Sequence, residues 1–160
     1  MHALFLMMTL AGAPAPSKAS GMPSGAVGHG IHVQAPAMWV ASMDGTTFVF
    51  SAPTQDASLR VDLYEKPKAG DAQTCLDEIV HRLAASEKTS PDSYTPTAVG
   101  GQPAATQTTF TPDRKQRTRR IVGCNGKSYF LIDWVELTHA GPKYAKAFTQ
   151  LLTAITYARP

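Results

Sequence analysis

The sequence lacks any apolar run long enough to cross a membrane as a helix. Its longest apolar run, residues 1–10, falls well short of the roughly 20 residues that a bilayer requires. Small residues follow at 11–13, as in the cleavage region of a secretory signal peptide. Residues 1–19 are therefore predicted to be an export signal, and the mature protein is expected to be soluble and periplasmic or extracellular. The alternative is that residues 1–13 form a buried element of the domain.

A lipid anchor of the bacterial lipoprotein type is not expected either. Leu10-Ala11-Gly12 resembles the residues that precede a lipidated cysteine, but position 13 is alanine. Because only a thiol can carry the lipid, this route to a membrane anchor is excluded.

Cysteine is scarce, with only Cys75 and Cys124 in the chain. Neither has a cysteine or histidine two to four residues away, which argues against a zinc site. In an exported protein the oxidising surroundings instead favour a disulfide between the two. The chain-entropy model gives such a bond about 4 kcal/mol of stability for a loop of this size. The alternative is two separate buried thiols.

Charged side chains are also few, at 17% of the chain, whereas there are 12 glycines and 12 prolines. This balance favours strands and turns over a helical bundle. The formal net charge of +3 is mild and does not by itself indicate nucleic acid or a membrane surface as partner. No internal repeat is present, and the roughly 140 residues after the signal suit one domain.

Periodicity predicts a single α+β domain at residues 31–160, preceded by a flexible leader at 20–30 that has few bulky side chains. Apolar stripes at helical spacing predict one helix over 71–88 and a second from near Pro142. We expect an antiparallel sheet of about six strands covered by these two amphipathic helices. The predicted strands span 31–36, 46–51, 59–64, 104–112, 117–124 and 128–137, with a hairpin turn at Asn125-Gly126.

Four segments carry a family resemblance, and together they cover about residues 31–157. They are Ile31–Pro36 followed by Trp39, Gly101–Ala104, Gly126–Leu131 and Phe148–Leu152. In this order they resemble the PsbP/Mog1-like domains, which include the bacterial DcrB and PsbP-related envelope proteins. The resemblance implies a central antiparallel sheet sandwiched by helices, serving as a non-catalytic accessory or binding module. It carries over no catalytic residues.

The densest charge feature is the basic run at residues 114–120, where five of seven side chains are Lys or Arg. Strand alternation places Arg117 and Arg119 on one face and Arg120 on the other. We expect a solvated edge strand, with the run exposed, so that neutralising Arg117 and Arg119 together leaves the fold intact. The alternative is a site for a polyanion or an acidic partner. Nucleic acid is not expected, because no aromatic residues are interleaved to stack on bases.

Other candidate sites are weaker. His29 and His32 have a spacing that could chelate a metal, but flanking glycines and the lack of a third ligand favour a linker, and no metal or cofactor is expected. No Gly-x-Ser-x-Gly motif accompanies His81 or His139. Asp133 lies between apolar neighbours and is interpreted as a solvent-facing strand residue or as the partner of an arginine on an adjacent strand. The alternative is an active-site acid.

These observations predict an exported, non-catalytic accessory or binding protein with a protein partner in the cell envelope or secretion pathway. The candidate binding residues are Arg117, Arg119, Arg120 and Trp134. Core packing is the alternative role for Trp134, as it is for Trp39 and Tyr129. The alternative functions are a small secreted hydrolase with an unrecognised active site and an anion- or metal-sequestering protein.

Overall fold

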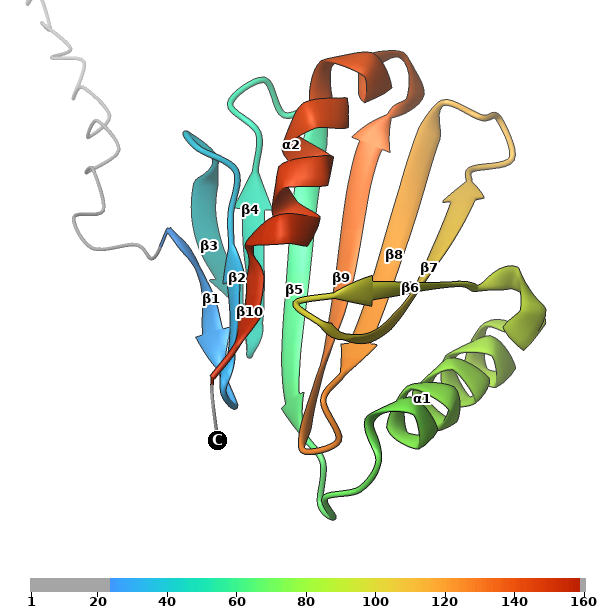
Figure 1. Ribbon diagram of the computed structural model, residues 1–160. Coiled ribbons are helices and arrows are strands. Elements are labelled where there is room, and N and C mark those ends of the chain that lie inside the picture. The colour runs from blue at the N-terminus through green and yellow to red at the C-terminus, as the bar shows by residue number, and fades with distance from the viewer. Residues whose placement is uncertain (1–23, 159–160) are drawn as a thin grey trace, which may run out of the picture.

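The computed structural model describes residues 24–158, so the predicted export signal at 1–19 lies outside the described residues. The fold is α+β, with a seven-stranded antiparallel sheet in the order β3-β4-β5-β9-β8-β7-β6 and a three-stranded sheet in the order β1-β2-β10 (Figure 1). Two helices, α1 (Ala72–Glu87) and α2 (Gly141–Ala154), pack against the large sheet. The predicted fold class is confirmed.

The large sheet consists of two antiparallel meanders joined by the pairing of β5 with β9, which sets Leu59 opposite Trp134. Short 3₁₀ turns precede β6 and α2, at Pro91–Ser93 and Thr138–Ala140. The strands are β1 (Gly25–Gly28), β2 (Ile31–Gln34), β3 (Val40–Asp44), β4 (Thr47–Ser51), β5 (Ala57–Glu65), β6 (Thr95–Val99), β7 (Gln102–Phe110), β8 (Gln116–Cys124), β9 (Ser128–Leu137) and β10 (Ile155–Tyr157).

The first face of the large sheet carries the main core. Along β9 the even-numbered side chains from Phe130 to Glu136 point to this face and are buried, because α2 and the three-stranded sheet cover them. Trp134 lies at the centre, with its ring centroid 4.9 Å from that of Trp39 and 5.4 Å from that of Phe148 on α2. The apolar stripe predicted for the second helix is thus explained by packing on the sheet.

The second face of the large sheet is covered only in part. Helix α1 packs on β7 and β8, and its buried residues include Cys75, Leu76 and Ile79. Asp71 caps the helix by accepting a hydrogen bond from the Thr74 amide at 2.8 Å, the usual contact of an N-cap aspartate. The predicted disulfide is confirmed: Cys75 is bonded to Cys124 with the Cα atoms 6.2 Å apart, which ties α1 to the end of β8.

The three-stranded sheet corrects the predicted leader at residues 20–30. Residues Gly25–Gly28 form β1, which pairs with β2 in an antiparallel register. Small residues favour this pairing, because a Cβ atom on Gly25 would collide with the Val33 carbonyl oxygen. The segment is ordered by backbone hydrogen bonds and by the buried Ala26, so bulky side chains are not required.

Candidate functional site

Residues 116–120 of the basic run lie on an interior strand, which corrects the prediction of an edge strand, whereas Arg114 and Lys115 lie in the turn before it and are exposed, as predicted. Strand β8 is paired on both sides, with β7 and with β9, so its backbone offers no free edge. The side chains of Arg117, Arg119 and Arg120 are only 26%, 16% and 18% exposed. The predicted division across two faces is confirmed: Arg117 and Arg119 point to the first face and Arg120 to the second.

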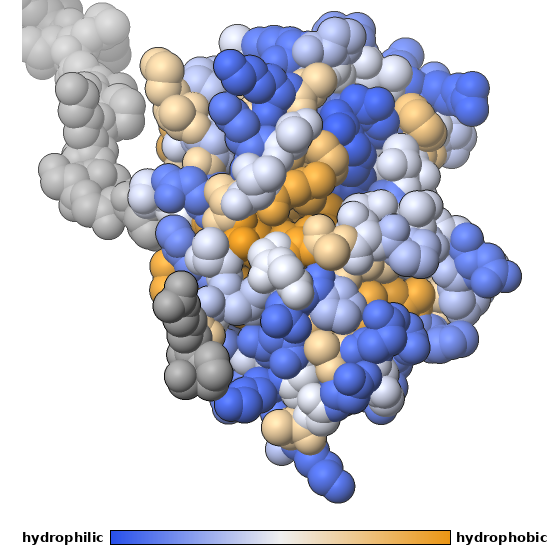
Figure 2. Space-filling view, in the orientation of Figure 1, coloured by the Kyte–Doolittle hydropathy of each residue, from blue (hydrophilic) through white to orange (hydrophobic). Residues whose placement is uncertain are grey.

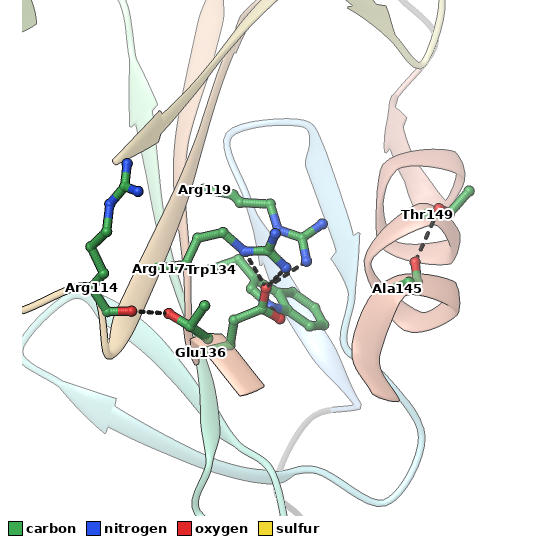
Figure 3. A network of polar contacts seen from close by, with 8 residues as sticks. Arg114, Arg117, Arg119, Trp134, Glu136, Ala145 and Thr149 are labelled. Atoms are coloured by element: carbon green, nitrogen blue, oxygen red, sulfur yellow. Dashed lines mark hydrogen bonds and ion pairs between the residues drawn. The ribbon is translucent and has the colours of Figure 1, made fainter. Parts of the chain in front are cut away.

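On the first face, Arg117 and Arg119 converge on the buried carboxylate of Glu136 (Figure 3). The Arg117 Nε donates to Glu136 Oε1 at 2.7 Å, and the Arg119 Nη2 donates to the same oxygen at 2.6 Å. The indole of Trp134 donates to the other carboxylate oxygen at 2.9 Å. The Arg119 guanidinium also lies 4.0 Å from the centre of the Phe148 ring.

This network keeps Glu136 ionised in the core. Burial raises the pKa of the Glu136 carboxyl, but the hydrogen bonds from Arg119, Trp134 and Arg117 outweigh it and hold the pKa below its ordinary value. Trp134 itself is fully buried, so it contributes to the core and is not a surface binding residue. Arg117 and Arg119 are likewise committed to a buried ion pair.

On the second face, Arg120 clamps Asp133. Its Nε and Nη2 donate to the two carboxylate oxygens of Asp133 at 2.7 and 2.9 Å, and its Nη1 donates to Glu87 at the end of α1. The predicted pairing of Asp133 with an arginine from an adjacent strand is confirmed. Both oxygens of the Asp133 carboxylate thus accept hydrogen bonds from Arg120.

Within residues 24–158 no element covers the part of the second face beyond α1, and we call this part the open sheet face. It lies over β4, β5 and β9 and presents alternate side chains of these strands. Strand register sets Arg60 opposite Asp133 and Asp133 opposite Arg120. Tyr129 and Leu131, at its border, also pack against the buried cluster under α1. By register the open sheet face is formed by Val49, Ser51, Ser58, Arg60, Asp62, Tyr64, Tyr129, Leu131, Asp133 and Val135.

A hollow of about 420 Å³ lies where the open sheet face meets the end of α1. Its charged side chains are Arg60, Arg120, Asp133 and Glu87, so positive and negative charges balance in number. Gln107, two threonines and Val135 complete the lining. Because the hollow presents no excess positive charge, this geometry does not favour the alternative of a polyanion site.

Aromatic side chains border the same face. The rings of Tyr64 and Tyr129 stack with centroids 4.7 Å apart and an interplanar angle of 17°. Burial raises the pKa of the Tyr64 phenol, and the nearby charge of Asp62 raises it further, so the hydroxyl stays neutral. Two-residue alternation places Arg60 and Tyr64 on the same face of β5, but no sequence motif singles them out as a site.

The remaining candidate residues do not assemble into one site. His29 lies 3.7 Å from Glu65, and no group of three potential metal-ligating side chains occurs within residues 24–158. His81 is exposed on α1, and His139 is exposed in the turn before α2. Among the helices in the described part of the chain, none has the length and apolar character to span a membrane.

No protein-family model matches this sequence, and no curated protein does. Solved structures do resemble it. The solution structure of cyanobacterial PsbP (CyanoP) from Synechocystis superposes with a TM-score of 0.55 at 13% sequence identity, covering 89% of this chain and 99% of that protein. The chain has a PsbP-like fold. The resemblance predicted from four short segments is therefore confirmed at the level of the fold.

Two other proteins share the PsbP-like fold. One, from Bacteroides thetaiotaomicron, superposes with a TM-score of 0.60 at 15% identity over 81% of this chain, which spans only 46% of that longer protein. The other is LpqN, involved in cell envelope biogenesis of Mycobacterium tuberculosis, with a TM-score of 0.53 at 15% identity, covering 81% of this chain and 83% of LpqN. At these identities the PsbP-like fold is established, and function has to be argued from the site.

Proposed function

We propose that this is an exported, non-catalytic accessory protein that binds a protein partner in the cell envelope or along the secretion pathway. The open sheet face is its contact surface. The observation that carries the proposal is that, in the part of the chain that the structure describes, nothing covers this half of the sheet face, which combines stacked tyrosines, aliphatic side chains and charge-balanced arginines.

The composition of the open sheet face supports a protein partner. Tyrosine and arginine are enriched at protein interfaces, and Tyr64 and Tyr129 supply rigid contact area at low entropic cost. Arg60 is 48% exposed, and its only ion pair within residues 24–158, to Asp44, is long at 3.9 Å, so its guanidinium remains available to an incoming carboxylate. Val49 and Val135 add apolar surface between the charges.

The carboxylates support a non-catalytic role. Asp133 is held by Arg120 and Glu136 by two arginines, so both carboxylates are engaged in contacts between neighbouring strands of the sheet. The disulfide supports export, since such bonds persist in oxidising compartments. LpqN, which has the same fold, is involved in cell envelope biogenesis, and this agrees with an envelope partner.

Site-specific photo-crosslinking in cells tests the proposal. A photoreactive phenylalanine analogue at position 64 is expected to give one discrete crosslinked product, whereas the same analogue at the exposed Lys146 of α2 is expected to give none. The change Arg60→Glu should remove the product from position 64 without lowering the melting temperature, because an exposed substitution costs within about 0.5 kcal/mol.

The opposite results would overturn the proposal. Equal crosslinking from positions 64 and 146 would show that the open sheet face is not a specific surface. If the purified protein instead hydrolyses ester, peptide or glycan substrates, and Asp133→Asn abolishes the activity, the protein is an enzyme.

A further inference from the structure

A second hollow lies on the other side of α1, between this helix and the edge strand β6. We call it the α1–β6 groove; its volume is about 410 Å³, and it shares no lining residue with the hollow beside the open sheet face. Figure 2 shows apolar surface in this position, bordered by hydrophilic residues. The volume falls within the roughly 300–1,000 Å³ that small-molecule sites occupy.

The floor of the groove is apolar. Leu76 and Val80 from α1 and Ala104 and Ala105 from β7 line it, and all four are at least nine-tenths buried. Ala105 explains part of this space, because its side chain points toward α1 and a larger one would fill the gap between the helix and the sheet, whereas the side chain of Ala104 packs in the core on the other face. The ring of Tyr94 closes one wall.

Two aspartates, Asp77 and Asp92, lie on the rim of the groove. The exposed imidazole of His81 also lines it, and no lysine or arginine does. Asp77 accepts a hydrogen bond from Gln73 at 2.8 Å, but neither aspartate has a basic side chain within 4.0 Å in the part of the chain that the structure describes. By contrast, Glu78 on the same helix is paired with Lys66 at 2.9 Å.

We propose that the α1–β6 groove binds a small organic cation that carries an apolar body. Asp77 and Asp92 attract its ammonium group, while Leu76, Val80 and Ala105 receive its alkyl or aryl part. The argument is charge complementarity: two carboxylates without cationic partners border an apolar pocket in a chain whose formal net charge is +3. The site is separate from the proposed protein contact on the open sheet face.

A matched pair of probes tests the proposal by isothermal titration calorimetry on the purified protein. Phenylpropylammonium and phenylpropionate share an apolar body and differ in the sign of the charge. We expect saturable binding of the ammonium and none of the carboxylate. Asp77→Asn and Asp92→Asn should each weaken ammonium binding roughly 2- to 5-fold, the range for partly exposed ion pairs. Asp113→Asn, in the turn between β7 and β8, is the matched control and should leave the affinity unchanged.

Two results would overturn the inference: equal binding of both probes, or unchanged ammonium affinity in the Asp77→Asn/Asp92→Asn double variant. A capped phenylalanyl-lysine amide identifies the source of the cation. Tighter binding of this peptide than of the free amine assigns the groove to a basic side chain of a partner, and weaker binding assigns it to a free small molecule. The change Arg60→Glu should not affect amine binding, so failure of the open sheet face as an interface is distinguishable from failure of the groove.

Discussion

Removing both arginines that hold Glu136 is expected to destabilise the fold strongly. The change Arg117→Met/Arg119→Met keeps unbranched apolar stems but leaves a fully buried carboxylate with only the Trp134 N–H as donor. Breaking a buried ion pair in this way costs about 3–5 kcal/mol. Small domains have only about 5–15 kcal/mol of net stability, so the loss is large.

Adding Glu136→Gln to this variant provides the internal test. Glutamine keeps a carbonyl oxygen for the Trp134 indole but removes the uncompensated charge. Replacing all members of a buried ion network is often nearly neutral, so the triple variant should recover most of the lost stability. Urea unfolding followed by tryptophan fluorescence measures each midpoint, and an unchanged slope confirms that stability alone has changed.

A double variant within about 0.5 kcal/mol of the wild type would refute this reasoning and restore the exposed-run hypothesis. A triple variant no more stable than the double one would show that the loss of stability comes from altered packing of the arginine side chains against Phe148 and not from the buried charge of Glu136. Lys115→Met is the matched control from the same basic run. The Lys115 side chain is 82% exposed, so this change should leave the urea midpoint unchanged.

Three further predictions concern stability. The pKa of Glu136 lies below its ordinary 4.5 in the folded protein, so the unfolded chain binds the proton first as the pH falls. The free energy of unfolding should therefore fall as the pH drops below 4.5, and less steeply in the Glu136→Gln variant. Urea midpoints measured across this pH range test the expectation. Cys75→Ser/Cys124→Ser should cost about 4 kcal/mol in the same assay, and a thiol assay of the native protein should find no free cysteine. Gly126→Ala should lower the stability measured by calorimetry more than Gly101→Ala does. Both glycines have a positive φ, which costs an alanine about 1–3 kcal/mol of strain. Of the two, only Gly126 lies where an added Cβ atom would also collide with backbone, the Gly70 carbonyl oxygen.

Local patterns were sufficient for the long elements. Two-residue alternation predicted β9 with its observed bounds, 128–137, and helical spacing placed α1 to within a residue at each end. The same alternation divided Arg119 from Arg120 correctly, because the side-chain period of a strand does not depend on its neighbours. The disulfide followed from the cysteine count and the predicted compartment.

The environment of the basic run could not be predicted in the same way. Burial of the arginines on β8 depends on the pairing of that strand with both β7 and β9, and on carboxylates that lie far away in the sequence. Glu136 and Glu87 are 17 and 33 residues from the arginines they contact, Arg119 and Arg120. A local pattern shows the positive charges without the negative ones that balance them.

Other features that the sequence did not predict also depend on tertiary packing. Strand β10 follows α2 directly and has only three residues, so it carries too little pattern to be recognised without its partner β2. The α1–β6 groove brings Asp77 together with Asp92 across a helix and a 3₁₀ turn, an arrangement that depends on how α1 lies on the sheet. Two-residue alternation is enough to put Arg60 and Tyr64 on one face of β5, but no local pattern shows that this part of the sheet is left uncovered within residues 24–158.

The three-stranded sheet determines how the molecule can be attached to a surface. Strands β1 and β10 flank β2, so the described chain enters and leaves through this small sheet, which packs on the first face of the large one (Figure 1). A biotin or affinity tag joined after β10 would therefore anchor the protein from that side. Immobilised in this orientation on a sensor chip, the protein would turn its open sheet face toward the flowing solution.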